Sequence, residues 1–191
     1  RHVCVCYSGS NTLQIYSISH QDRTLSAVGP PHSLPDAPAK IVLDPLGNHV
    51  FISYPMGNML ESYSVNSNTG ELRFTATIGT LAQPDSIAID PTGQFLYLSA
   101  NGASRLLGYR INNGQFTAPL GNLTTPEGTT GALLSFSRRA DTLYAVLHGS
   151  GLVLTCTIDA TTGLLTPVGL PDSTGGADRK STRLNSSHSE I

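Results

Sequence analysis

The stretch HVFISYPMGNMLESYSV at residues 49–65 decides the fold, because an earlier part of the chain repeats it. The segment HVCVCYSGSNTLQIYSI at residues 2–18 matches it at an offset of 47 without a gap, so that His, Val, Tyr, Asn, Leu, Tyr and Ser recur in register. A second segment, IVLDPLG at residues 41–47, recurs as IAIDPTG at 87–93 and, degraded, as LSFSRRA at 134–140. The chain is therefore built from a repeat of 46 to 47 residues, a period typical of repeat architectures.

Each repeat is expected to contain four short strands. In the second repeat these strands are predicted at residues 39–43, 49–54, 59–65 and 71–78, and the first is apolar enough to be buried on both faces. The tetrapeptide DPLG at 44–47 fits a type I turn, in which Asp accepts a backbone hydrogen bond and Pro fixes φ. A second turn, closed by Gly70, returns as Asn113-Gly114 and Thr161-Thr162-Gly163, which are hairpin signals.

This pattern predicts an all-β fold, a β-propeller of four-stranded blades arranged as a partial ring. A single blade cannot bury its faces, so blades must stack around an axis. A β-sandwich would also have short strands, but it would not repeat without a gap and keep the same turn in the same place. The blade repeats are expected at about residues 2–29 (three strands only), 37–79, 84–124 and 130–169.

The last residues are expected to lie outside the propeller, which would occupy residues 1–176. The string DRKSTRLNSSH at residues 178–188 has no apolar alternation and matches, over eleven residues, one translated frame of a common high-throughput sequencing adapter. We therefore expect residues 177–191 to be a non-native, disordered tail, and the natural protein to be truncated near Gly176.

Composition excludes several functions. A net charge of −2 with 13% charged residues argues against nucleic-acid binding, which needs surplus Lys and Arg. No apolar run approaches the roughly 20 residues that span a bilayer. Cys4, Cys6 and Cys156 are an odd number without framework spacing, so they are predicted to be small strand hydrophobes, neither disulfides nor metal ligands. With no signal peptide visible, we expect a cytoplasmic protein without a metal site, secretion being the alternative.

The motif DPTGQFLYLS at residues 90–99 resembles the repeat of the seven-bladed propeller lactonase family, which includes a 6-phosphogluconolactonase and fungal enzymes that make or open muconate lactones. The resemblance covers nearly all of residues 2–170. It implies about three and a half blades of seven, and hydrolysis of a small sugar-acid lactone at the channel mouth without a cofactor. It further implies a monomer when full length, with a small-molecule lactone as its only partner, and a fragment that is inactive alone.

The chain departs from the family at one inner strand. Many members carry His-x-His before the Asp-Pro turn of the fourth blade, and the corresponding positions here are Thr130 and Ala132. Two alternatives to a hydrolase therefore stay open. One is a non-catalytic propeller that binds a ligand or partner at its channel mouth, and the other is a muconate-lactonizing isomerase.

Binding candidates are expected where loops feed the inner strands, at residues 30–38, 79–85 and 123–130. Lys40 could contact an anion or be a solvated lysine at a strand end, and Asp85 could be a carboxylate at the mouth or a loop cap. Glu127 has the same two readings as Asp85. His148, in a loop beside Gly149-Ser150-Gly151, could be a general base, although no nucleophile is spaced to accompany it.

Other repeated residues are assigned to structure, and no residue is assigned as catalytic. His2 and His49 occupy the same position in the repeat, which favours a structural role. The repeating aromatic residues are expected to pack between blades; they are Tyr16, Phe51, Tyr63, Tyr97 and Tyr144.

Overall fold

The structure, a computed structural model, describes residues 2–66, 68–80, 83–137 and 141–174. Within these ranges the chain consists of strands, turns and connecting segments, and no helix in them could cross a membrane. The predicted tail at 177–191 lies outside the described residues, as does Arg138 of the degraded turn.

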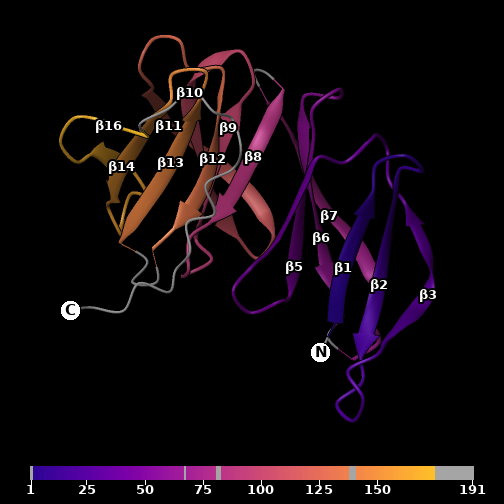
Figure 1. Cartoon of the computed structure of the whole chain (residues 1–191). Coiled ribbons are helices and arrows are strands. Elements are labelled where there is room, and N and C mark those ends of the chain that lie inside the picture. The colour runs from indigo at the N-terminus through magenta and orange to yellow at the C-terminus, as the bar shows by residue number, and fades with distance from the viewer. Residues whose placement is uncertain (1, 67, 81–82, 138–140, 175–191) are drawn as a thin grey trace.

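Four antiparallel sheets follow one another along the chain, and Figure 1 shows them side by side in the same order. The first sheet comprises β1 (His2–Tyr7), β2 (Thr12–Ile18) and β3 (Leu25–Ser33). The second comprises β4 (Lys40–Leu43), β5 (His49–Tyr54), β6 (Met59–Val65) and β7 (Leu72–Gly79). The third comprises β8 (Pro84–Ile89), β9 (Phe95–Ala100), β10 (Ala103–Asn112) and β11 (Gln115–Thr124). The fourth comprises β12 (Gly131–Phe136), β13 (Thr142–His148), β14 (Leu152–Ile158), β15 (Leu165–Pro167) and β16 (Asp172–Ser173).

The sheets confirm the all-β, partial-propeller prediction. In the second and third sheets and along β12 to β15 of the fourth, the strands pair in chain order, so that β4, β8 and β12 each lie at one edge of their sheet. These three edge strands neighbour one another, β4 beside β8 and β8 beside β12, as the inner strands of adjacent blades do. The sequence did not indicate β16, which pairs with β14 next to β15.

The repeated DPxG turns form because each Asp serves the backbone twice. The Gly47 N–H donates to the carbonyl of Asp44 at 2.9 Å, and the Asp44 carboxylate accepts the Asn48 N–H at 2.7 Å. Gly93 and Asp90 repeat the first of these bonds at the same distance. The predicted type I turn is thus confirmed, and it sets the register between inner and second strands.

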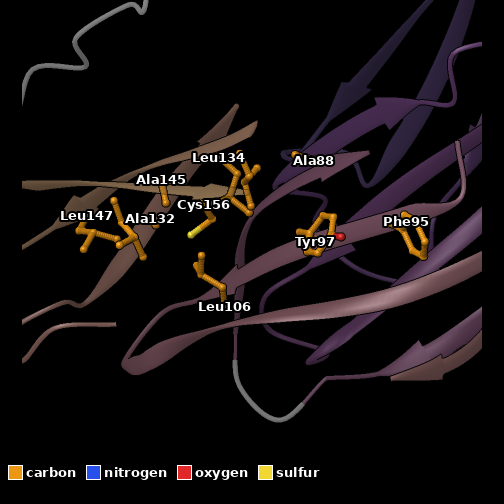
Figure 2. Packing of buried hydrophobic residues seen from close by; sticks show 11 residues of the cluster. Ala88, Phe95, Tyr97, Leu106, Ala132, Leu134, Ala145, Leu147 and Cys156 are labelled. Carbon is orange, nitrogen blue, oxygen red and sulfur yellow. The ribbon is translucent and has the colours of Figure 1, made fainter. Parts of the chain in front are cut away.

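The core consists of one apolar cluster in each seam between neighbouring sheets. Figure 2 shows the seam between the third and fourth sheets, where Cys156 lies among Leu106, Leu134 and Ala145. Burial raises the pKa of the Cys156 thiol to about 11, so it remains protonated at neutral pH and packs as a small hydrophobe. Cys4 and Cys6 pack against the cluster of the first seam in the same way.

A hairpin turn of each later sheet locks onto the sheet before it. The Ser62 hydroxyl donates to the carbonyl of Gly114 at 2.6 Å, and the Tyr97 hydroxyl donates to the carbonyl of Gly163 at 2.6 Å. The hairpin turn of the third sheet is thus hydrogen-bonded to the second sheet, and the hairpin turn of the fourth sheet is hydrogen-bonded to the third. The predicted packing role of Tyr97 between blades is confirmed.

Some strand predictions need correction. The expected burial of residues 39–43 on both faces is wrong, because Lys40 and Leu43 are exposed and Leu43 retains 43% of its accessible surface. The inner strand β8 covers one side of β4, but among the described residues no inner strand of the first sheet covers the other. The loops are also shorter than expected, since β3 runs to Ser33 and β8 begins at Pro84.

Candidate functional site

The beginnings of the inner strands form one end of the sheets. Lys40 begins β4 and pairs with Ser53, and Ser86 of β8 pairs with Ser99 in the equivalent register. The start of β12, at Gly131, lies beside the start of β8. This end corresponds to the predicted channel mouth.

Two of the predicted residues meet here. His148 is the last residue of β13 and lies opposite Gly131 in the strand register. Its Nδ1 atom is 3.5 Å from Oδ2 of Asp85, which lies in β8 of the preceding sheet. The side chains keep 52% and 36% of their surface exposed, so a small ligand and water can reach both. The sequence predicted loop positions for Asp85 and His148, but both residues lie in strands. Their contact joins two blades, so Asp85 is paired with His148 and is not a loop cap.

Gly131 provides the space in which this pair forms. A Cβ atom at Gly131 would lie 2.7 Å from Oδ2 of Asp85 and 3.7 Å from Nδ1 of His148. Any side chain at this position would therefore displace the Asp85 carboxylate. The backbone of Gly131 is not left-handed, so the steric limit concerns the pair and not the chain conformation.

The connection between β11 and β12 braces the pair from one side. The Thr130 N–H donates to the carbonyl of His148 at 2.9 Å, and the Gly102 N–H donates to the carbonyl of Thr130 at 2.9 Å. The Ser104 hydroxyl donates to the carbonyl of Thr129 at 3.2 Å. These bonds fix the backbone that carries His148 although its side chain is half exposed.

The geometry of the pair suits proton transfer. A carboxylate that faces Nδ1 favours the tautomer with the proton on that atom, in which Nε2 is the acceptor. At 3.5 Å the contact is an ion-pair distance longer than a normal hydrogen bond. Catalytic contacts often shorten only when substrate binds.

The other predicted residues do not join this pair. Lys40 is exposed at the start of β4, and its backbone N–H donates to the Ser53 hydroxyl at 3.2 Å. Glu127 is exposed in the connection between β11 and β12. In the part of the chain that the structure describes, neither side chain forms an ion pair.

The residues at the family's histidine positions have different surroundings. Thr130 is exposed just before β12, whereas Ala132 in β12 is fully buried in the seam. The carbonyl of Ala132 accepts a hydrogen bond from the Ser99 hydroxyl at 2.7 Å. His148 lies next to Thr130, whose N–H donates to the His148 carbonyl.

His49 forms a second Asp–His pair, away from this end. Its Nδ1 lies 3.1 Å from Oδ2 of Asp44, and both side chains are largely buried. The turn at Gly114 packs directly over the imidazole ring. The structural role predicted for His49 is confirmed.

Sequence reasoning missed a buried polar group in the first seam. The Tyr63 hydroxyl donates to the Glu61 carboxylate at 2.6 Å, and the nearby Tyr54 hydroxyl is fully buried without a hydrogen-bond partner among the described residues. Burial raises the pKa of both tyrosines. Within the described ranges, no group of three or more His, Cys, Asp or Glu side chains is arranged to hold a metal ion.

Sequence comparison identifies the family. The profile of the family described as "Lactonase, 7-bladed beta-propeller" matches residues 1–84 and 75–177. The chain belongs to the seven-bladed β-propeller lactonase family. The resemblance inferred from the repeat is thereby confirmed, and the described sheets are blades of a seven-bladed fold. No curated protein sequence matches the chain.

Solved structures share this lactonase-family fold at low sequence identity. A candidate 6-phosphogluconolactonase from Bacteroides uniformis superposes with a TM-score of 0.78 at 15% identity, covering 91% of this chain and 52% of that one. A protein from Lactobacillus plantarum gives 0.78 at 19% identity, with the same coverage of each chain. The periplasmic gluconolactonase of Pseudomonas aeruginosa gives 0.69 at 16% identity, covering 90% and 52%. The chain thus spans about half the length of these proteins.

Proposed function

We propose that the complete protein hydrolyses a small sugar-acid lactone at the end of the sheets where the inner strands begin. The observation that carries this proposal is membership of the lactonase family across residues 1–177. Two of the structural neighbours are described as lactonases of sugar acids, which favours this substrate class for the present chain.

The local chemistry supports the same reaction. Opening a lactone requires a base that activates water and a positive or N–H group that stabilises the oxyanion. Asp85 and His148 offer an accessible base at this end, and Lys40 begins a neighbouring inner strand with its charge exposed. The exposed polar character of the region suits a hydrophilic substrate.

The test is a hydrolysis assay with the protein encoded by the full reading frame. Ring opening of gluconolactone and of its 6-phosphate would be followed by acid release at constant pH, against heat-denatured protein at the same concentration. We expect hydrolysis well above the spontaneous rate, and a preference between the two substrates would report whether a phosphate is recognised. No acceleration with either lactone would reject the proposal.

One observation favours a second function, a propeller that binds a ligand without turnover. The family's two histidine positions hold Thr130 and the fully buried Ala132, so neither can act as a base. Calorimetric binding of gluconolactone or gluconate, without accelerated ring opening, would support this alternative over the hydrolase.

A further inference from the structure

We propose that His148 is the general base of this site, that Asp85 is its positioning residue, and that Gly131 keeps the space in which the two meet. The proposal rests on the lactone hydrolysis proposed above. It deepens that function by assigning the proton transfer to a histidine from β13, outside the inner strands.

The first argument is the arrangement across two blades. Asp85 belongs to the third sheet and His148 to the fourth, and their 3.5 Å contact bridges the seam at the end where the inner strands begin. Within the described ranges, Asp85 is the one charged group in ion-pair contact with His148. A carboxylate in this position orients the ring and favours the tautomer whose Nε2 can take a proton.

Both side chains of the pair are accessible to solvent. Because an exposed ion pair contributes little to stability, a stabilising role does not explain this pair. His148 and Asp85 nevertheless lie on braced backbone, because the Thr130 N–H and the strand register fix the end of β13. General-base catalysis needs a base that is held in position and that substrate and water can reach, and His148 meets both conditions.

Gly131 lies beside both Asp85 and His148. Any Cβ atom at this position would come within 2.7 Å of the Asp85 carboxylate. Alanine at this position would meet only the end of a movable side chain, so it would shift the carboxylate without disturbing the strand. Gly131 therefore matters for the pair more than for the fold.

In the proposed step, Nε2 of His148 removes a proton from a water molecule as the water oxygen adds to the lactone carbonyl carbon. The ring C–O bond then breaks, and the alkoxide that leaves takes the proton from His148. The products are the open hydroxy acid and neutral His148.

The test uses the complete protein and three substitutions. His148→Gln should lower kcat about 100-fold or more, with KM changed less than about threefold. Asp85→Asn should lower kcat about 10-fold with KM changed less than about threefold, because the uncharged amide no longer orients the imidazole or stabilises the positive charge that forms on it during the reaction. Gly131→Ala should reproduce this loss of kcat at nearly unchanged KM, although both members of the pair are present.

Matched controls separate this role from a structural one. His20→Gln removes an exposed histidine from the turn before β3, and Gly9→Ala adds a Cβ at a glycine in the turn between β1 and β2 where no atom lies within 4 Å. Both should keep wild-type kinetics. All five variants should unfold at wild-type temperature within about 2 °C, so that lost activity is not lost fold.

The outcomes distinguish the two proposals. Wild-type hydrolysis with full activity in His148→Gln would overturn this inference and leave the lactonase function standing. A wild-type protein that does not accelerate hydrolysis would overturn both. Wild-type kcat in Asp85→Asn, with activity lost in His148→Gln, would reject the positioning role.

Discussion

Two Asp–His pairs occur in the part of the chain that the structure describes, and they differ in almost everything except their residue types. Asp44 and His49 flank one turn, lie 3.1 Å apart, and keep only 14% and 13% of their side-chain surface exposed. Asp85 and His148 come from different sheets, lie 3.5 Å apart, and keep 36% and 52% exposed. One pair is sealed inside a seam between blades, and the other opens toward solvent at the beginnings of the inner strands.

A glycine accompanies each pair, and the two glycines show what the difference means. Gly114 has a φ of 74° and belongs to the hairpin turn of the third sheet, where it covers His49 of the second. Gly131 belongs to a strand and leaves room for Asp85. The first glycine serves packing between blades, whereas the second serves an accessible polar contact. Burial and neighbours separate a structural pair from a candidate site, and residue type does not.

The largest expected effect compares alanine at the two glycines. In Gly114→Ala the new Cβ would clash with Cδ2 of His49 and would force a left-handed backbone on a non-glycine residue. Overpacking and backbone strain together should lower the free energy of unfolding by about 2–4 kcal/mol. Gly131→Ala should change it by less than about 1 kcal/mol. Urea denaturation of both variants measures the difference, and equal losses would contradict the contrast.

The next effect compares glutamine at the two histidines. His49→Gln leaves the largely buried Asp44 carboxylate without its imidazole partner, which should cost about 1–2 kcal/mol of stability. His148→Gln removes a half-exposed side chain and should stay within about 0.5 kcal/mol of wild type. Thermal unfolding of both variants at pH 7 measures this difference in stability. Greater destabilisation by His148→Gln than by His49→Gln would mean that the exposed pair is the structural one.

The repeat made the fold predictable, and particular residues show why. The spacing of the DPLG and DPTG turns placed strands 49–54 and 59–65 correctly, because the turn Asp fixes where each pairing begins. Burial of β4 was predicted wrongly, since it depends on whether a neighbouring sheet has an inner strand. A residue's own repeat carries no information about that neighbour.

The candidate site was only partly predictable for a related reason. Asp85 and His148 were each recognisable as polar residues near the expected channel mouth, but their contact joins two sheets and so depends on packing between blades. Gly131 gave no signal of its own, because a glycine in a strand is ambiguous until its neighbours are known. Counting outward from the connection between β12 and β13 would have aligned His148 with Gly131, which is the one sequence signal available.

The smallest expected effect concerns an aspartate without a histidine partner, which can be compared with the aspartates of the two Asp–His pairs. Asp159 opens the hairpin turn of the fourth sheet, and its carboxylate accepts the Thr162 N–H at 2.7 Å and the Thr161 N–H at 2.9 Å. Asn66 in the second sheet accepts the same kind of bonds with an amide oxygen that cannot titrate.

Hydrogen bonds from Thr162 and Thr161 hold the pKa of Asp159 below its ordinary value. The folded state therefore binds this proton less readily than the unfolded state does. The resulting stabilisation is present above the unfolded-state pKa of about 3.9, and it is lost as the pH falls through the lower folded-state pKa.

Asp159→Asn should keep the turn, as Asn66 does, and remove this dependence of stability on pH. The difference in unfolding temperature between wild type and variant should thus change between pH 6 and pH 3 in the direction that favours the variant in acid. Asn66→Asp is the reciprocal test, because it should add an acid-sensitive turn to the second sheet. Parallel unfolding curves for wild type and Asp159→Asn across this range would show that the turn does not discriminate the ionised carboxylate from an amide.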